Sequence, residues 1–447
     1  MKKKFSVLVN KKIKKFNKKI EIPGDKSCSI RAILLATQCI GISKIKNLLE
    51  SEDVLNCVNT LKISLGVKII KKNNIYQIHG NGLNSFKTKN GITKIYVGNS
   101  GTSARLLAGL LSTHPKKFYL YGDESMNKRD FTRVIQPLEK IGAFFYPSNK
   151  KTLPLIIEGT SMPLAQNHIE SRGSAQVKGL ILMSALSTPG ITTIEEKKIS
   201  RNHTELFLKK INADIKVKKI KDGNLILLRG QKNLYGFNYT VSSDPSSAAF
   251  LIALSLLTPG SRLVINNVLC NETRIFFLKI LKKINANIKI KNLKKVSGER
   301  VGTIVVCGSK LKPMVVSKDV GKYVDELPIL FVIAALTKGI SKFKNIGDLK
   351  NKESNRLLES KKILDQAGIK CRITKNSMVI HGQDKIMPQN KTIITKTEGD
   401  HRMCMSSAIL SLATGVKVKI KNFETVNTSF PEFIRLIKSL GAKIAIK

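Results

Sequence analysis

The sequence has no tryptophan, few aromatic residues and far fewer acidic than basic side chains. Aromatics make up 6% of the 447 residues, and 78 lysines and arginines against 31 aspartates and glutamates give a formal net charge of +47 at pH 7. Such an excess suggests a nucleic-acid partner. The lysines, however, are spread over the whole chain, without an arginine-rich stripe or a patterned set of aromatics on which bases could stack. We therefore expect no nucleic-acid partner, and a small anionic substrate that the same positive field attracts.

The sequence also lacks paired cysteines, metal-binding spacings and long apolar runs. Its seven cysteines are scattered without a CxxC, which favours reduced thiols in a cytoplasmic protein. The six histidines show no metal-ligand spacing, so no metal site is expected. No apolar run is long enough for a transmembrane helix, and the stretch FSVLV in the basic N-terminus is too short for a signal peptide. These absences predict a cytoplasmic protein without a membrane partner.

Six times the chain repeats one ending, in which an amphipathic helix pattern reaches a turn-forming residue and then a β segment. Successive copies follow at intervals of 70–83 residues. A regular period of this length indicates one structural unit copied six times. Glycine and asparagine suit the left-handed position that ends a helix. The six turn residues are Gly66, Gly142, Asn212, Asn285, Gly368 and Gly441.

A second periodic feature precedes each ending by roughly 40 residues, as the repeat spacing requires. It is a short polar segment that leads into an apolar helical run, so each copy predicts a helix start. Helix starts offer free N–H groups and the positive end of the helix dipole, which suit anions. If the units are related by pseudo-symmetry, the six starts could converge on one cleft. The segments are GDKSCSIR (24–31), GNSGTSAR (98–105), GSAQVKG (173–179), SDPSSAAF (243–250), YVDELPIL (323–330) and GDHRMCMSS (399–407).

Strand-like runs alternate with the helical patterns and predict an α/β fold. Examples are KFYLYG, LILLRG, GTIVVCG and SMVIHG. A chain of 447 residues is too long for one ordinary core, so two or three domains are expected. No linker is rich in proline, glycine or serine, and the boundaries are therefore placed from the repeats, three per domain, with chain crossings near 22–24 and 240–243.

Nine motifs in order along the chain resemble the EPSP synthase family (3-phosphoshikimate 1-carboxyvinyltransferase). SAQVK, SRNHTE and SFPEF resemble the bacterial second class of that family. A lone DKS or DHR would be unspecific, but nine ordered matches over essentially the whole chain are highly specific. The motifs are PGDKSCSIRAILLA, GNSGTSARLLAGLL, GDESMNKRDFTRVIQPLEKIGA, SAQVKGLILMSAL, SRNHTELFL, DPSSAAF, VDELPIL, KESNRL and DHRMCMS.

The resemblance implies a two-domain inside-out α/β barrel with six βαβαββ repeats, three per domain, and an active site between the domains. The implied lower domain is residues 1–23 and 242–447, and the upper domain is residues 24–241. The implied reaction transfers the carboxyvinyl group of phosphoenolpyruvate to the 5-hydroxyl of shikimate 3-phosphate, in the shikimate pathway of aromatic amino-acid biosynthesis. It needs no metal or organic cofactor, and the protein is expected to be a monomer.

The resemblance also assigns substrate and catalytic roles to residues of this chain. Asp325 is expected to take the proton of the 5-hydroxyl, and Glu353 with Lys352 to protonate the methylene of phosphoenolpyruvate, with Lys26 contacting both substrates. Lys178 is expected to add positive charge. The implied shikimate 3-phosphate site is Lys26, Ser27, Arg31, Ser174, Ala175, Gln176, Ser200, Arg201, Asp325 and Lys352. The implied phosphoenolpyruvate site is Lys26, Asn99, Gly101, Arg129, Gln176, Arg356 and Arg402.

Neighbouring residues receive supporting roles. Asp400 and His401 are expected to orient Arg402, Asp244 to cap a helix, and Glu326 to rank behind Asp325 as a base. Some glyphosate-insensitive second-class enzymes carry alanine at the position of Gly101, so glycine there predicts inhibition by glyphosate.

The chain departs from the family pattern at four positions. Ile30 stands where histidine is usual, Asp130 where proline is usual and Asn202 where aspartate is usual, while Thr428 occupies the place of a lysine that some members carry.

Other interpretations stay open. The sister enolpyruvyl transferase that acts on UDP-N-acetylglucosamine shares the fold, but GDKS, KRDF and KESNRL fit it poorly, and GDESMNKRD lacks the reactive cysteine expected in its mobile loop. A basic nucleic-acid-binding repeat protein is a distant alternative. Taken singly, each polar segment would be an ordinary capped helix start with solvated charges.

Overall fold

The computed structural model describes residues 4–88 and 90–447 and divides into two compact units. The N-unit is residues 24–242 together with 295–299, and the C-unit is residues 1–23, 243–294 and 300–447. The five residues 295–299 lie in the sequence range that the resemblance gives to the lower domain, yet they contact the N-unit. No helix among the described residues is both long and apolar enough to cross a membrane.

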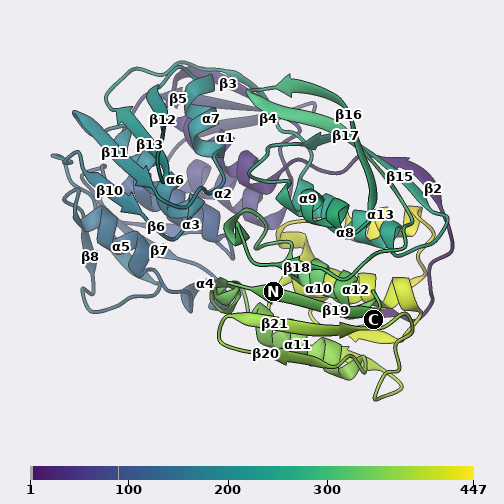
Figure 1. Ribbon diagram of the computed structural model, residues 1–447. Helices are drawn as coiled ribbons and strands as arrows, with labels where there is room; N and C mark the ends of the chain where they lie inside the picture. The colour runs from purple at the N-terminus through teal and green to yellow at the C-terminus, as the bar shows by residue number, and fades with distance from the viewer. Residues whose placement is uncertain (1–3, 89) are drawn as a thin grey trace. The chain divides into compact units, whose positions relative to one another are not determined.

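The N-unit contains seven helices and twelve strands among its described residues (Figure 1). Its helices are α1 (Lys26–Thr37), α2 (Glu52–Ile63), α3 (Gly101–Leu111), α4 (Glu124–Asn127), α5 (Thr132–Glu139), α6 (Ala175–Ala185) and α7 (His203–Lys210). Its strands are β3 (Ile40–Lys46), β4 (Lys68–Lys72), β5 (Ile75–Asn81), β6 (Ile92–Tyr96), β7 (Lys117–Tyr121), β8 (Phe144–Tyr146), β9 (Leu155–Glu158), β10 (Asn167–Glu170), β11 (Ile191–Glu196), β12 (Asp214–Ile220), β13 (Gly223–Arg229) and β14 (Asn238–Thr240).

The C-unit holds the remaining elements. Its α-helices are α8 (Pro245–Leu256), α9 (Phe276–Lys283), α10 (Leu327–Ala335), α11 (Arg356–Gln366), α12 (His401–Thr414) and α13 (Phe433–Ser439), and its 3₁₀ helices are η1 (Val320–Lys322), η2 (Gly347–Asn351) and η3 (Phe423–Thr428). Its strands are β1 (Val7–Val9), β2 (Asn17–Ile20), β15 (Arg262–Leu269), β16 (Asn287–Val296), β17 (Glu299–Cys307), β18 (Val315–Val316), β19 (Gly339–Lys344), β20 (Cys371–Ile373), β21 (Ser377–Gly382), β22 (Ile393–Thr395), β23 (Val418–Ile420) and β24 (Ile444–Ile446).

The strands form six four-stranded sheets, three in each unit. Those of the N-unit have the orders β14-β3-β5-β4, β6-β7-β9-β8 and β10-β11-β13-β12, and those of the C-unit have the orders β16-β17-β15-β2, β18-β19-β21-β20 and β22-β23-β1-β24. Every sheet has one parallel pair at an edge, such as β6 with β7 or β18 with β19. The next pair inward is antiparallel in all six, as in β7 with β9. The sixfold sequence period therefore corresponds to six sheets of one design.

Two strands are exchanged between the first and fourth copies of this design. β2, which precedes α1, pairs with β15 in the C-unit, whereas β14, which precedes α8, pairs with β3 in the N-unit. The chain passes from one unit to the other next to these strands, after Pro23 and Ser242. This exchange explains why the C-unit contains the N-terminal residues.

The predicted helix endings are confirmed. All six turn residues have a positive φ, from 60° at Asn212 to 104° at Gly142. The six polar segments are likewise confirmed as helix starts, because they open α1, α3, α6, α8, α10 and α12. Five of these helices have a side-chain cap, and Asp244 caps α8 as predicted, accepting a hydrogen bond from the N–H of Ser246. α10 is the exception, since the side chain of Glu326 makes no cap hydrogen bond.

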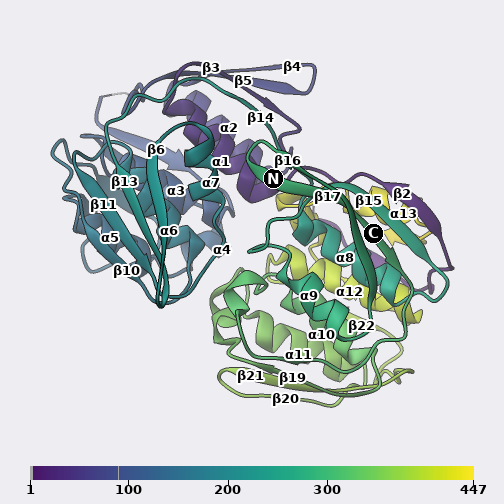
Figure 2. The same cartoon turned by 45° about the horizontal axis from the view of Figure 1, so that its top comes forward.

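The helices opened by the polar segments form the centre of each unit. α3 packs against both α1 and α6 in the N-unit, and α8, α10 and α12 pack against one another in the C-unit. Every residue of α8 and α10 is buried, as expected for helices that are apolar all round. Figure 2 shows α10 and α11 beside β19, β20 and β21, so the sheets cover the central helices from outside.

Candidate active site

The starts of α3 and α6 lie together in the N-unit. Gln176 Nε2, in the first turn of α6, donates to Thr102 Oγ1, in the first turn of α3, over 3.2 Å. Ser174 caps α6 by accepting a hydrogen bond from the N–H of Val177 over 3.3 Å. The Ser174–Gln176 segment is therefore fixed to α3 through Thr102.

The start of α1 carries a lysine whose ammonium is held by a buried aspartate. Lys26 Nζ lies 2.9 Å from Asp53 Oδ2, and the lysine side chain is 16% exposed while the aspartate is 3% exposed. Asp25 caps the helix through the N–H of Cys28 over 2.8 Å. Lys26 thus projects from a fixed helix start with part of its surface open to solvent.

Arg31 lies one turn further along α1 and is buried. Its Nε donates to Thr204 Oγ1 over 2.9 Å, and its Nη1 donates to the carbonyl of Ser27 over 3.0 Å. Burial lowers the pKa of the Arg31 guanidinium, and the nearby positive charge of Arg201 lowers it as well. Two guanidinium groups close enough to repel one another form a natural site for an anion such as a phosphate.

The segment before α3 positions the third cationic group of the N-unit. Arg129 Nη2 donates to Asn99 Oδ1, and Asn99 Nδ2 donates to Asp123 Oδ2 over 2.7 Å. A Cβ placed on Gly101 would lie 2.5 Å from Arg105 Nη1 and 3.1 Å from Arg129 Nη1. Only glycine lets both guanidinium groups lie against this helix start, so the predicted residues Asn99, Gly101 and Arg129 are neighbours.

The expectation that Lys178 adds charge to a substrate site is wrong. Its ammonium is fully buried and lies 2.6 Å from Glu196 and 2.7 Å from Glu205. Ser200 joins the same cluster, because its hydroxyl and its N–H both donate to Glu196, over 2.5 and 2.9 Å. Lys178 therefore holds the Ser200 segment in place from within the core.

In the C-unit, one buried arginine gathers three carboxylates. Arg356 Nε lies 2.7 Å from Asp400 Oδ2, Nη2 lies 2.5 Å from Glu353 Oε2, and Nη1 lies 3.4 Å from Asp325 Oδ1. Burial lowers the pKa of Arg356, but the charges of Asp400, Glu353 and Asp325 outweigh it and raise the pKa overall. The guanidinium therefore stays charged and holds Asp325 and Glu353 close together, as their predicted pairing requires.

Two further cations reach Asp325 from other elements. Lys352 Nζ lies 3.4 Å from Asp325 Oδ1, and Arg402 Nη1 donates to the Asp325 carbonyl over 3.0 Å. Asp325 and Glu353 are 18% and 19% exposed and Lys352 is 27% exposed, whereas Arg356 is 1% exposed. The three predicted proton-transfer groups can therefore meet a ligand, but a further anion could bind Arg356 only by replacing one of its carboxylates.

One supporting role is corrected. Asp400 accepts from the backbone N–H of Arg402, but its side chain binds the guanidinium of Arg356, so it positions Arg356 and not the Arg402 side chain. His401 Nδ1 lies 3.4 Å from Thr428 Oγ1. The partners of the Arg402 guanidinium are instead groups of Asp325. A helix cap with a second carboxylate oxygen can serve two partners, which a sequence motif cannot show.

Glu326 is a structural residue of the C-unit. It is fully buried, with its carboxylate hydrogen-bonded to the hydroxyl of Ser246 and 3.5 Å from Arg274 Nη1. Arg274 also lies 3.0 Å from Asp244 Oδ1. This network joins the starts of α8 and α10, and Arg274 was missed because it lies outside all six polar segments.

The four departures from the family pattern lie in different structural settings. Ile30 is fully buried, so the missing histidine leaves an apolar core position. Asp130 accepts from the N–H and the hydroxyl of Thr132, and Thr428 donates to the Thr425 carbonyl. Asn202 precedes α7 without a side-chain cap bond. The exchanged polar side chains at 130 and 428 are thus used locally.

Comparison with known proteins identifies relatives over nearly the whole chain. Residues 10–437 match the family EPSP synthase (3-phosphoshikimate 1-carboxyvinyltransferase). The 3-phosphoshikimate 1-carboxyvinyltransferase of Paramagnetospirillum magneticum is 35% identical over 427 residues, which cover 95% of each chain. That of Zymomonas mobilis is 35% identical over 441 residues, covering 98% of this chain and 96% of the relative.

Solved structures agree with the sequence comparison. The EPSP synthase of Acinetobacter baumannii superposes with a TM-score of 0.84 at 33% identity, covering 99% of this chain and 100% of that one. The enolpyruvyl transferase NikO of Streptomyces tendae has a TM-score of 0.75 at 12% identity, which shows a shared fold. The chain therefore has the mixed α/β fold of the enolpyruvyl transferases and belongs to the EPSP synthase family.

Proposed function

We infer that this chain, as a 3-phosphoshikimate 1-carboxyvinyltransferase of the shikimate pathway, uses the residues described above to join shikimate 3-phosphate and phosphoenolpyruvate. In this reaction the 5-hydroxyl oxygen attacks C2 of phosphoenolpyruvate while C3 gains a proton. The tetrahedral intermediate then loses a proton from C3 as its C2–O bond to phosphate breaks, which gives 5-enolpyruvylshikimate 3-phosphate and inorganic phosphate. The observation that carries the assignment of proton transfer is the pair of carboxylates, Asp325 and Glu353, held on the guanidinium of Arg356.

The architecture is, in this proposal, an inside-out α/β barrel of six βαβαββ repeats with three repeats per domain. Three sheets in each unit and the same parallel edge pair in all six support it. The exchange of β2 and β14 supports a lower domain of residues 1–23 and 242–447 and an upper domain of residues 24–241. We also propose that the protein belongs to the bacterial second class of the family and is a cytoplasmic monomer. The seven free cysteines are consistent with a reducing compartment.

Shikimate 3-phosphate binding is assigned to the starts of α1, α6 and α7. The neighbouring Arg31 and Arg201 suit the phosphate, because each guanidinium offers planar donors to its oxygens. Ser27, Ser174, Ala175, Gln176 and Ser200 would add short polar contacts from helix starts that the structure caps and cross-links.

Phosphoenolpyruvate binding is assigned to Lys26, Asn99, Gly101, Arg129, Gln176, Arg356 and Arg402. The guanidinium groups of Arg105 and Arg129 that lie against Gly101 suit a phosphate or carboxylate oxygen. Arg402 is 11% exposed, whereas Arg356 is 1% exposed and already binds three carboxylates. Arg402 is therefore the more accessible of these two guanidinium groups.

Asp325 is assigned as the base and Glu353 with Lys352 as the proton donors. Asp325 Oδ1 lies 3.4 Å from both Lys352 and Arg356, so its ionised form is stabilised and can accept the proton of the 5-hydroxyl. Glu353 contacts the same arginine and is equally exposed. In the addition step Asp325 gains one proton, and Glu353 with Lys352 gives one proton to C3. The total number of protons on these three groups is therefore unchanged.

The proposal is tested by phosphate release from the purified chain. Release should require both shikimate 3-phosphate and phosphoenolpyruvate, and UDP-N-acetylglucosamine should not replace the former. Changing Lys26, Arg201 or Arg402 to glutamine should lower activity strongly. Gln383, half-buried in the loop after β21, offers a control, since Gln383→Ala touches none of the assigned groups. Phosphate release from phosphoenolpyruvate with UDP-N-acetylglucosamine, and not with shikimate 3-phosphate, would instead indicate the activity of the sister enzyme.

A further inference from the structure

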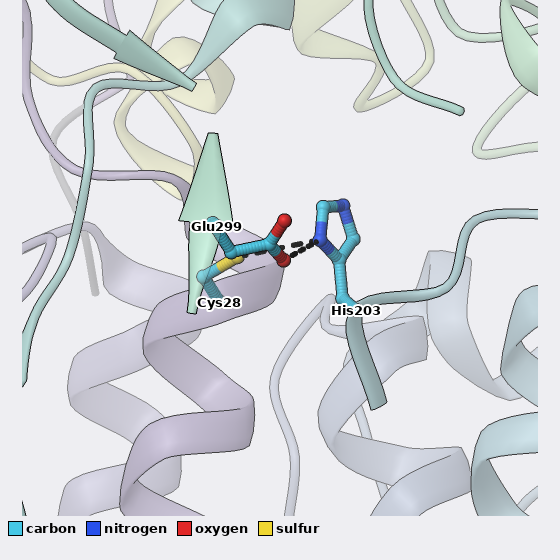
Figure 3. Close-up of side chains that lie close together, drawn as sticks. All are labelled: Cys28, His203 and Glu299. Atoms are coloured by element: carbon cyan, nitrogen blue, oxygen red, sulfur yellow. Dashed lines mark hydrogen bonds and ion pairs between the residues drawn. The ribbon is translucent and has the colours of Figure 1, made fainter. Parts of the chain in front are cut away.

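Three buried side chains with metal-binding chemistry meet in the N-unit, apart from the groups assigned to proton transfer. The sulfur of Cys28, Nδ1 of His203 and a carboxylate oxygen of Glu299 all lie within 4.8 Å of one another (Figure 3). The exposed fractions of the three residues are 2%, 2% and 4%. Buried thiol, imidazole and carboxylate groups with converging donor atoms need a physical account.

The three residues come from three separate elements. Cys28 lies in the first turn of α1, His203 is the first residue of α7, and Glu299 is the first residue of β17. Glu299 belongs to the 295–299 segment, which clusters with the N-unit. This segment contains the end of β16, the turn that follows it and the first residue of β17. Glu299 Oε1 lies 2.7 Å from His203 Nδ1, and Cys28 Sγ lies 3.8 Å from the same nitrogen.

The arrangement does not suit nucleophilic catalysis. In a Cys–His–acid triad the thiol and the acid bind opposite nitrogens of the imidazole ring, so that the acid orients the base. Here both groups approach Nδ1, and Nε2 is buried with no hydrogen-bond partner among the described residues. The three donor atoms instead lie close enough together to share one metal ion.

We propose that Cys28, His203 and Glu299 form a Zn²⁺ site. Zinc binds thiolate, imidazole and carboxylate at about 2.0–2.3 Å, so tetrahedral ligand atoms stand roughly 3.3–3.6 Å apart. The Cys28–His203 separation of 3.8 Å is close to this spacing, and the Glu299–His203 separation of 2.7 Å is a hydrogen bond that the metal would replace. The carboxylate has to retreat by less than about 1 Å.

The charges around the cluster are compatible with a divalent cation. A Cys28 thiolate and the Glu299 carboxylate together neutralise two positive charges, so the nearby Arg31 faces no added net charge. The hydroxyl of Tyr239 is hydrogen-bonded to Cys28 and is itself buried, which raises its pKa. A phenol that keeps its proton can donate to the coordinated sulfur, as outer-shell partners of metal ligands commonly do.

The metal would fix two substrate-binding segments and one turn relative to each other. Cys28 directly follows Lys26 and Ser27, and His203 lies two residues after Arg201. A metal bound to both residues would hold these segments in register, while Glu299 would fix the turn between β16 and β17. The site is a positioning element and takes no part in the chemistry, and its existence does not depend on the proposed substrate roles.

The proposal is tested with Co²⁺ and Zn²⁺ on the full chain after treatment with a chelator. One equivalent of Co²⁺ should give a thiolate-to-cobalt charge-transfer band in the near ultraviolet, and Zn²⁺ should abolish it by displacement. Cys28→Ser should lose the band. Glu299→Gln should weaken binding at least about tenfold, the lower end of the effect of losing even an outer-shell partner. Ring-nitrogen NMR should show the His203 proton on Nδ1 without metal and on Nε2 with it.

Matched controls separate this site from adventitious binding. Cys270→Ser changes another buried cysteine, far from His203 in the chain and in the other unit, and should keep the full band. Cys371→Ser removes a partly exposed thiol beside Asp365 and should also keep it. The proposal is overturned if wild-type protein gives no band, or if the band survives Cys28→Ser.

Discussion

The two buried arginines Arg31 and Arg356 show how differently the two units treat the same side chain. In the N-unit, burial and the nearby Arg201 both lower the pKa of Arg31. In the C-unit, burial acts in the same sense on Arg356, but three carboxylates reverse the result and raise the pKa. Burial thus dominates at Arg31 despite the opposing charges of Asp25 and Glu205, whereas at Arg356 the carboxylates dominate and are held together by the guanidinium.

In the proposed function, the cationic groups of the N-unit are assigned to substrate binding and the carboxylates of the C-unit to proton transfer. Around Arg356 the charges balance, since Arg356, Lys352 and Arg402 face the carboxylates of Asp325, Glu353 and Asp400. A proton can shift within this balanced cluster, and an anionic ligand would compete with its carboxylates for Arg356. The cationic helix starts of the N-unit suit anion binding, and the acid-rich cluster of the C-unit suits acid–base catalysis.

The largest expected effect is on turnover in the C-unit. Asp325→Asn keeps the size and the hydrogen bonds of the side chain but cannot accept the 5-hydroxyl proton. We expect kcat to fall about 10²–10⁴-fold, the range for loss of a general base, with a small change in KM. Steady-state phosphate release measures both constants. Asp319→Asn, at an exposed left-handed position, is the control and should retain wild-type kcat; equal losses in both variants would contradict a base role.

The second effect is on stability in the same cluster. Arg356→Met leaves Asp400, Glu353 and Asp325 without their shared partner, and should lower the free energy of unfolding by about 3–5 kcal/mol. Urea unfolding followed by circular dichroism measures this change. Lys352→Met removes only a partly exposed contact and should cost less than about 1 kcal/mol. Similar costs for both would show that Arg356 does not hold the cluster.

The third effect separates two lysines of the N-unit. Lys178→Met leaves Glu196 and Glu205 buried without a cation and should also cost about 3–5 kcal/mol of stability. Lys26→Gln keeps a donor for Asp53, so its free energy of unfolding should change by less than about 1 kcal/mol. Its kcat/KM should nevertheless fall about 100-fold, because it removes a charge that stabilises the reacting anions. A large loss of stability in Lys26→Gln, together with a loss of activity but not of stability in Lys178→Met, would contradict these two roles.

A fourth, smaller effect concerns the glycine at the start of α3. Gly101→Ala would place a methyl group against Arg105 and Arg129, displacing both guanidinium groups. We expect KM for phosphoenolpyruvate to rise about 10-fold, the scale of one misplaced methyl group, with KM for shikimate 3-phosphate unchanged. The wild-type enzyme should be inhibited by glyphosate, and the variant less so. Full wild-type turnover at millimolar glyphosate would show that Gly101 does not confer sensitivity.

The smallest effect is a pH dependence of stability beside α6. Burial raises the pKa of Glu170, but hydrogen bonds from His168 and from the N–H groups of Arg172 and Ser174 outweigh it, so the pKa is lowered overall. A lowered pKa contributes stability that is present above the unfolded pKa and is lost as pH falls through the folded one. Glu170→Gln should therefore be less stable than wild type at neutral pH but not at about pH 3. A constant difference across that range would contradict this linkage.

The sequence was sufficient for the repeat design and the helix starts. Turn residues such as Gly66 and Asn285 recur at a fixed interval and need a left-handed backbone, so local chemistry alone located them. The capping role of Asp244 followed from the same kind of local rule. The placement of residues 1–23 with the C-terminal half was reached only through the family resemblance, because strand pairing over long sequence separations, such as that of β2 with β15, leaves no local signal.

The partners of charged side chains were the part that sequence could not provide. Lys178 lies in a motif beside Gln176, yet it points into the core between two glutamates. Asp400 was assigned to its neighbour Arg402, but binds Arg356 across 44 positions of the chain. The Cys28–His203–Glu299 cluster joins three distant elements, which is why histidine spacing gave no hint of it. Such contacts depend on tertiary packing.

The division between a binding half and a proton-transfer half is tested most directly by steady-state kinetics of Arg201→Gln and Asp325→Asn side by side, with shikimate 3-phosphate as the varied substrate. We predict that Arg201→Gln raises KM for shikimate 3-phosphate with kcat largely kept, and that Asp325→Asn lowers kcat with KM largely kept. A loss of kcat alone in Arg201→Gln, together with a rise of KM alone in Asp325→Asn, would contradict the division.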